Sequence, residues 1–177
     1  MTRVAALIRD IRGSAGAEMA LSLPLLLTLL FVSIEMGNYV YSEHRLVESV
    51  RDGARFAART DLANFPCAGS TNATLVTTTQ KVVRTGTVSG TVDLLPKYDD
   101  QAAYINVTHS CTTSVTPDAT TGATVAIGGI YKTSPTGAPV VNIDASVPYR
   151  SILGAMTGST VLSLTLRAEQ EALVIGF

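Results

Sequence analysis

Glu18 stands directly before a long apolar run, where a charged side chain needs a specific partner. The stretch from Met19 to Ile34 contains sixteen residues and no charge. A carboxylate well inside a bilayer costs about 2.5–3.5 kcal/mol on insertion scales, so Glu18 needs a cationic partner if this stretch crosses a membrane. The alternative is that Glu18, at the edge of the run, simply reaches the headgroup layer.

Gly13 and Ser14 lie just before Glu18 and have the features of a processing site. Gly13 disfavours helix and offers a protease an extended backbone without a side chain. Cleavage between the two residues would give Ser14 a free α-ammonium group, four residues before Glu18 on the same helix. In an assembly of parallel helices, the Glu18 carboxylate of one subunit could then neutralise the new N-terminus of another.

Patterns typical of enzymes and metal sites are missing from the sequence. His44 and His109 have no Cys, His or carboxylate neighbours at metal-ligand spacing, so we expect a solvated or interfacial His44 and a strand residue at His109. No G-x-S-x-G, Walker-type or G-x-G-x-x-G motif occurs. The pair Asp99-Asp100 is expected in a polar turn. We therefore expect no enzyme activity, no cofactor, no metal and no small-molecule substrate.

The charges are distributed unevenly along the chain. Its 13 basic and 14 acidic side chains give a formal charge of −1. The first thirteen residues hold Arg3, Arg9 and Arg12 against Asp10, so the remainder carries 10 basic and 13 acidic side chains, a net charge of −3. No basic stripe remains to bind phosphates, and nucleic-acid binding is not expected. The basic leader before the apolar run predicts a cytoplasmic N-terminus, with residues 42–177 outside.

The run from Met19 to Ile34 predicts a membrane anchor of near-minimal length. Sixteen helical residues span about 24 Å, whereas the hydrocarbon core of a bilayer is about 30 Å thick. Extension through residues 35–41, with Glu35 at the interface, brings the span into range, and Tyr39 and Tyr41 then lie where an aromatic belt is expected. No A-x-A-like cleavage site follows the run, which disfavours a cleaved signal peptide.

Cys67 and Cys111 both follow the predicted anchor. An even pair of cysteines outside the cytoplasm favours a disulfide over a metal site. Closing that loop would stabilise the fold by roughly 4 kcal/mol in the chain-entropy treatment. The alternative is two free, buried thiols.

Two further helical segments are predicted. The first continues the anchor over residues 42–60, and its apolar stripe must pack either against this chain's own domain or against a neighbouring helix. The second covers residues 70–86, with Ser70 or Thr71 as N-cap and Gly86 after its last turn, although its threonine content leaves a β-strand as the alternative. The stripe positions at spacings of three and four are Leu46, Val47, Val50, Ala54, Ala57 and Ala58.

Three segments alternate between apolar and polar residues and predict strands, namely residues 102–112, 139–147 and 160–169. A short strand over 123–127 and a helical turn over 151–156 are also expected. Such strands form an antiparallel sheet that needs a helix to cover its apolar face. The side chains predicted to face inward are Ile105, Val107, His109 and Cys111 in the first segment, Val141, Ile143, Ala145 and Val147 in the second, and Leu162, Leu164 and Leu166 in the third.

The predicted fold class is therefore α+β. A cytoplasmic leader (1–13) precedes a long N-terminal transmembrane and amphipathic helix (14–60). A small head with a three- to four-stranded antiparallel sheet covered by helix follows (61–177), and the resemblance described next implies that this head is pilin-like.

The first third of the chain resembles the TadE-like family, minor pilins (pseudopilins) of tight-adherence (Flp) pilus systems. That family typically reads R-G-x-x-x-x-E-F-A-L-x-x-P-x-L-L, followed by an E-F-G-like triplet and then A-x-R-E-G-A-R-x-A. Met19 and Met36 stand where the family usually has an aromatic residue. The matching positions are Arg12, Gly13, Glu18, Ala20, Leu21, Pro24, Leu26, Glu35-Met36-Gly37 and Arg51-Asp52-Gly53-Ala54-Arg55.

The resemblance implies a protein of the bacterial inner membrane with a periplasmic head. Its implied partners are membrane lipid, a prepilin peptidase that cuts between Gly13 and Ser14, other pilins and inner-membrane platform proteins of the pilus. Glu18, Met19 and Pro24 would serve in peptidase recognition and assembly. The alternative is an anchored extracytoplasmic binding or adhesion module, in which the helix is only a tether.

Overall fold

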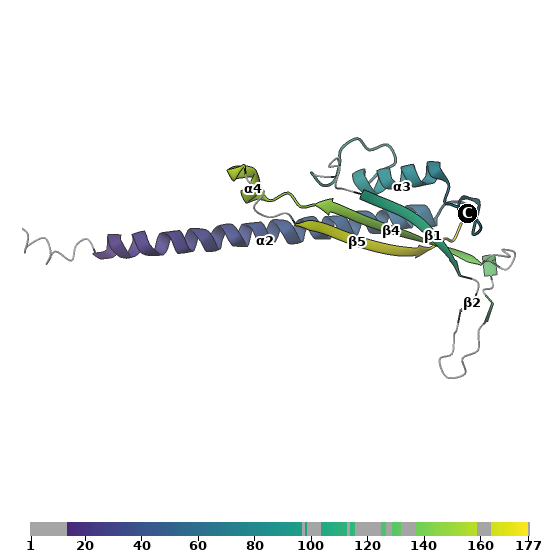
Figure 1. Cartoon of the computed structure of the whole chain (residues 1–177), viewed down its shortest axis with the longest axis horizontal. Helices are drawn as coiled ribbons and strands as arrows, with labels where there is room; N and C mark the ends of the chain where they lie inside the picture. The colour runs from purple at the N-terminus through teal and green to yellow at the C-terminus, as the bar shows by residue number, and fades with distance from the viewer. Residues whose placement is uncertain are drawn as a thin grey trace, which may run out of the picture.

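A long helix and a small sheet dominate the computed structural model, which describes residues 14–96, 98, 104–112, 114–115, 125–126, 129–131, 137–158 and 164–176. The predicted leader with Gly13, the pair Asp99-Asp100 and Leu162 lie outside the described residues. The described chain is α+β, as the sequence predicts. The arrangement places an apolar rod at one end and a packed head at the other (Figure 1).

Helix α2, Ser14–Ala58, has 45 residues and runs without a break from the anchor into the head. At 1.5 Å per residue it is about 68 Å long. Its first half projects beyond the rest of the chain, and its second half lies along the sheet (Figure 1). The predicted stripe is buried there: Leu46, Val50 and Ala57 have no exposed surface. The stripe therefore packs against this chain's own domain.

Helix α3, Ala73–Thr85, confirms the predicted helix over residues 70–86, and the strand alternative is wrong. Its N-cap is Asn72, whose side chain accepts a hydrogen bond from the Thr74 amide, in place of the expected Ser70 or Thr71. Gly86 ends it in the left-handed conformation with φ of 77°, which favours glycine.

The main sheet has three antiparallel strands in the order β1-β4-β5, namely β1 (Tyr104–Thr112), β4 (Ala138–Pro148) and β5 (Thr165–Leu173). The central strand β4 pairs with both neighbours, so that Ile143 stands opposite Val107 in β1 and Gln170 in β5. The predictions for the first two strands are confirmed.

The third strand lies further along the chain than predicted. It begins at Thr165, and the expected inward residue Leu164 is 42% exposed, whereas Leu166 is 2% exposed. The strand continues through residues 167–173, where charged side chains alternate with Ala168 and Ala172. These alanines pack against the core but give a weak apolar signal, so the alternation of the preceding leucines dominated the sequence pattern.

The remaining elements are short. A second sheet pairs β2 (Ser114–Val115) with β3 (Val125–Ala126). Strand β3 lies within the short strand expected over 123–127. The 3-10 turns are η2 (Leu62–Asn64) and η3 (Gly129–Tyr131). Helix α4, Ile152–Thr157, confirms the predicted helical turn after β4.

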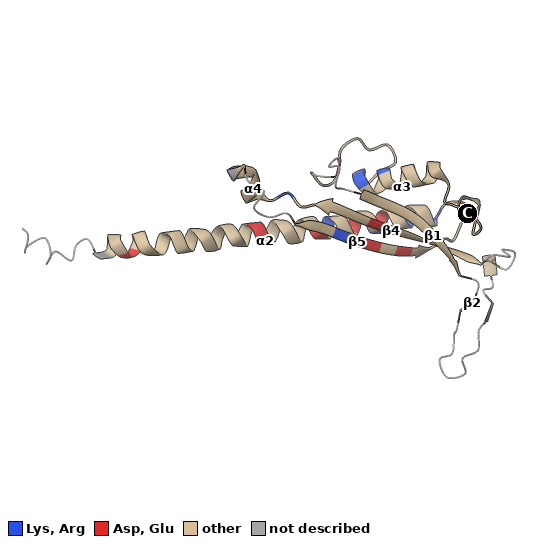
Figure 2. Cartoon of the chain, in the orientation of Figure 1, with Lys and Arg blue, Asp and Glu red and all other residues tan. Residues whose placement is uncertain are grey.

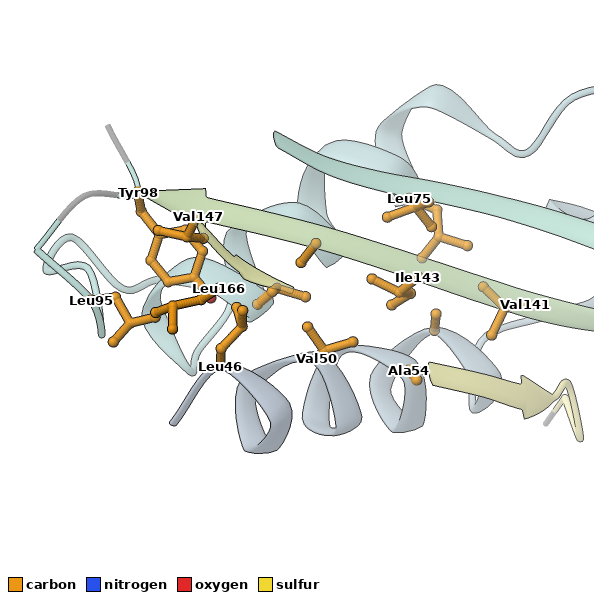
Figure 3. Close-up of a cluster of buried hydrophobic side chains, with 14 of the residues drawn as sticks. Leu46, Val50, Ala54, Leu75, Leu95, Tyr98, Val141, Ile143, Val147 and Leu166 are labelled. Atoms are coloured by element: carbon orange, nitrogen blue, oxygen red, sulfur yellow. The ribbon is translucent and has the colours of Figure 1, made fainter. Parts of the chain in front are cut away.

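The core lies between the second half of α2, helix α3 and one face of the main sheet (Figure 3). Leu46 and Val50 of α2 meet Ile143 and Val147 of β4, and Leu166 of β5 closes one end. The α2 half therefore forms part of the head, and the sheet is covered by helix as expected.

The disulfide between Cys67 and Cys111 is present in the structure, with the two Cα atoms 5.7 Å apart. It joins the segment between α2 and α3 to the end of β1. Beside it, His109 Nδ1 contacts the Thr71 hydroxyl at 2.7 Å and Nε2 contacts the Pro66 carbonyl at 3.2 Å. Both ring nitrogens are occupied by these protein contacts, which accounts for His109 as a structural residue of the strand.

Candidate anchoring and assembly site

The projecting half of α2 exposes apolar side chains on every side. Leu21 is 82% exposed and Leu25 is 65% exposed, and all residues from Ala15 to Ile34 are exposed. Among the described residues, α2 is the one helix long and apolar enough to cross a membrane, and 6% of its most apolar window is buried within the chain. A core helix of a soluble protein would bury most of such a window. One N-terminal apolar helix is thus a candidate single membrane anchor.

The hydroxyl groups in this half are satisfied by its own backbone. Thr28 Oγ1 donates to the Pro24 carbonyl at 2.7 Å, Ser33 Oγ donates to the Leu29 carbonyl at 2.7 Å, and Ser22 Oγ donates to the Met19 carbonyl at 3.3 Å. Hydroxyls bonded in this way present little polar surface to an apolar environment. Figure 2 shows that acidic and basic residues are sparse along the projecting half and gather where α2 meets the sheet.

The expected processing and assembly residues that the structure describes lie toward the free end of the anchor. Ser14 begins α2, and Glu18, Met19 and Pro24 are exposed on it, far from the head. The exposed Glu18 carboxylate has no hydrogen-bond or ion-pair partner among the described residues. Its pairing with the Ser14 ammonium group of a neighbouring subunit stays a prediction.

Glu35 marks the point where the anchor meets the head. Glu35 is 7% exposed, whereas the sequence led us to expect it at the open membrane interface. Oε1 accepts a hydrogen bond from the Tyr149 hydroxyl at 2.8 Å, and Oε2 accepts from the backbone amides of Ile152 and Leu153, each at 3.1 Å. Hydrogen bonds to an ionised group are stronger than those between neutral groups. This carboxylate therefore holds α4 and the end of β4 onto α2.

The next turn of α2 strengthens the same junction, which we call the Glu35 clamp (Glu35, Asn38, Tyr39, Tyr149 and the amides of 152–153). Asn38 Nδ2 donates to the Tyr149 hydroxyl at 2.7 Å, and the Tyr39 and Tyr149 rings pack edge to face with centroids 5.2 Å apart. Burial raises the pKa of Tyr149 above its usual value, so its hydroxyl stays protonated and donates to Glu35. The clamp fixes how the head sits on the anchor.

Sequence reasoning missed this clamp because Glu35 is 114 to 118 residues away from the groups that donate to it. Two local signals pointed toward it. The Glu35-Met36-Gly37 triplet belongs to the resemblance, and Ser151 is a good N-cap whose hydroxyl accepts from the Gly154 amide at 2.9 Å. Neither signal indicates that the two segments meet.

Gly53, in the motif from Arg51 to Arg55, lies where α2 and α3 approach closely. A Cβ atom at Gly53 would overlap with Cγ2 of Val83 and would lie 3.4 Å from Cδ1 of Ile143. Ala54 is buried, whereas Arg51 is exposed. The motif thus supplies small residues on the side of α2 that packs against α3 and charged side chains on the side that faces solvent.

The fold and this site define a protein with one candidate membrane anchor and a small α+β head clamped to its end. The family model described as TadE-like protein matches residues 13–55. This match confirms the resemblance seen in the sequence, and it covers the anchor, Glu35 and the glycine motif. Neither a curated protein nor a solved structure matches the chain with significant similarity. The TadE-like segment indicates involvement in a Tad pilus system, and other pilus components are plausible partners.

Proposed function

We propose that this protein is a minor pilin (pseudopilin) or assembly factor of a tight-adherence pilus. The observation that carries the proposal is that the TadE-like match falls on a helix whose residues 19–34 are exposed, uncharged and largely apolar. An apolar surface of this extent needs lipid or other apolar helices around it. In the proposed arrangement, the anchor lies in the bacterial inner membrane, its N-terminus is cytoplasmic and its head is periplasmic.

The proposed processing step is hydrolysis of the amide bond between Gly13 and Ser14 by a prepilin peptidase. Water adds to the Gly13 carbonyl carbon, the C–N bond breaks, and the products are a Gly13 carboxylate and a Ser14 α-ammonium group. The exposed Glu18 carboxylate of a neighbouring subunit then neutralises this ammonium group inside the apolar assembly, where an unpaired charge is costly. The anchor packs among pilin helices or against platform proteins.

Two measurements test this proposal. Mass spectrometry of the protein purified from membranes should find Ser14 as the mature N-terminus, and any other N-terminus counts against the processing step. Glu18→Ala should permit cleavage but reduce the number of pili on the cell. Glu43→Ala is the matched control, because Glu43 is an exposed carboxylate on the same helix. Unchanged piliation in Glu18→Ala would exclude the pairing role.

Exchange of residues 14–34 separates an assembly helix from a simple tether. The exchange with an unrelated spanning helix should stop at Ile34, because the next residue belongs to the Glu35 clamp. If the helix is a tether for a binding module, the exchanged protein should keep its function. If the helix assembles with other pilus subunits, pilus formation should be lost while the head stays folded.

A further inference from the structure

A cavity of about 520 Å³ lies beside the Glu35 clamp, where the anchor enters the head. It opens between α2, residues 94–96, the end of β4 and helix α4. Its volume is within the range of about 300–1,000 Å³ that is usual for small-molecule sites. Asn38, Tyr149 and Ile152 of the clamp form one edge of its lining, and the other lining residues lie outside the clamp.

The cavity combines an apolar wall with two cationic side chains. The wall includes Leu95, Ile152 and Met156, and the cations are Arg45 of α2 and Arg150, which follows β4. None of the described residues that line the cavity is acidic. This composition suits an amphipathic ligand with a negatively charged group.

Arg45 is available for such a ligand. Its guanidinium carbon lies 5.7 Å from the centre of the Tyr41 ring, and its Nε atom is buried without a hydrogen-bond partner. Neither Arg45 nor Arg150 forms an ion pair with another part of the described chain. The Glu35 carboxylate of the clamp already accepts hydrogen bonds from the Tyr149 hydroxyl and from the amides of Ile152 and Leu153. The terminal nitrogens of the Arg45 guanidinium group are the donors that a phosphate would use, since arginine binds phosphate oxygens through paired hydrogen bonds.

The position of the cavity along α2 points to the membrane surface. The exposed apolar half of α2 ends at Ile34. The Arg45 side chain runs back toward the ring of Tyr41, which lies seven residues after Ile34 on the helix. That separation is about 10 Å along the helix. Polar headgroups extend about 5–8 Å beyond the hydrocarbon core on each side. Lipid phosphates would therefore lie within reach of this guanidinium group.

We propose that this cavity binds the headgroup of an anionic phospholipid, with Arg45 and Arg150 holding its phosphate. The apolar wall formed by Leu95, Ile152 and Met156 covers the glycerol and the upper part of an acyl chain. This inference rests on the membrane anchoring in the proposed function but does not depend on the role in the pilus. The bound lipid would fix the depth of the head at the membrane surface.

Native mass spectrometry of the full-length protein, released from lipid nanodiscs, tests the site. Nanodiscs of phosphatidylcholine alone are compared with nanodiscs that also contain phosphatidylglycerol. The protein should retain phosphatidylglycerol in preference to phosphatidylcholine. Arg45→Gln and Arg150→Gln should each lower that retention about tenfold, as expected for the loss of a charge-assisted hydrogen bond. Arg51→Gln, which removes an exposed charge from the same helix away from the cavity, should leave it unchanged.

Several outcomes would overturn the lipid site. Equal retention of the two lipids would show that the cavity does not select an anionic headgroup. An equal loss in Arg51→Gln would show that general electrostatic attraction, and not this cavity, retains the lipid. Displacement of the lipid by inorganic phosphate would identify a free anion as the occupant, and a second copy of the chain in place of lipid would identify a protein interface. Arg150 is exposed, so Arg150→Gln keeps the test valid if Arg45→Gln does not fold. A protein that fails to enter the nanodisc would instead contradict the anchor itself.

Discussion

The two halves of α2 are one continuous helix but face different surroundings. Residues 19–34 carry no charge and expose apolar side chains on every side, whereas residues 46–58 are apolar along one stripe that is buried by the sheet and α3. One continuous helix therefore has two different surroundings along its length. The comparison teaches that the distribution of apolar residues around the helix, rather than their number, decides whether it needs lipid or its own domain. The Glu35 clamp marks the change from one half to the other.

The largest difference between the halves should appear when a charge is placed in each. Val50→Asp puts an unpaired carboxylate into the core and should destabilise the head by about 3–5 kcal/mol, which is a large share of the stability of a small domain. Val32→Asp, on the exposed half, should leave unfolding of the head unchanged and instead weaken membrane insertion. Chemical denaturation in detergent measures the first effect, and membrane fractionation measures the second. Equal destabilisation by both variants would contradict the division.

Removal of the disulfide should also affect the head alone. Replacement of both Cys67 and Cys111 by Ser opens a loop whose ends are 44 residues apart and should lower the free energy of unfolding by about 4 kcal/mol. Membrane insertion of the anchor should be unchanged. Thermal denaturation monitored by circular dichroism, with and without reductant for the unmodified protein, provides the measurement. A melting temperature that does not change would argue against a stabilising disulfide.

Glu35→Ala should loosen the junction between the halves. The change removes the carboxylate that accepts hydrogen bonds from the amides of Ile152 and Leu153 and from the Tyr149 hydroxyl, and we expect a loss of about 2–4 kcal/mol. Hydrogen exchange should become faster at those two amides. Glu18→Ala is the matched control and should not change the exchange of the head. Protection that persists at both amides would exclude the clamp.

Of these variants, Gly53→Ala should change the free energy of unfolding least. Its control, Gly37→Ala, should change that free energy in the opposite direction. The added methyl group overlaps with Val83, and we expect a destabilisation of about 1–3 kcal/mol. Gly37 has open space around its Cα, so Gly37→Ala should stabilise α2 slightly through helix propensity. Denaturation of both variants side by side would test the contrast, and a stabilising Gly53→Ala would show that α3 can move aside.

The features that could be predicted from the sequence are those carried by local patterns. The apolar run, the buried stripe of α2, helix α3 and strands β1 and β4 follow from periodicity and capping residues. The position of β5 could not be found in this way, because Ala168 and Ala172 face the core without a strong apolar signal. Glu35 and Gly53 were visible as parts of a motif, but their partners lie on segments that only the tertiary fold brings together.

The division of α2 can be tested most directly by measuring the environment of single positions. Spin labels at Leu25 and Arg51 sample the two halves, and both native side chains are exposed, so that neither label should disturb packing. In reconstituted membranes, we expect the label at position 25 to be accessible to oxygen, which concentrates in lipid, and the label at position 51 to be accessible to a water-soluble relaxation agent. Equal accessibility of both labels to the water-soluble agent would contradict a helix that is half in the membrane and half in the head.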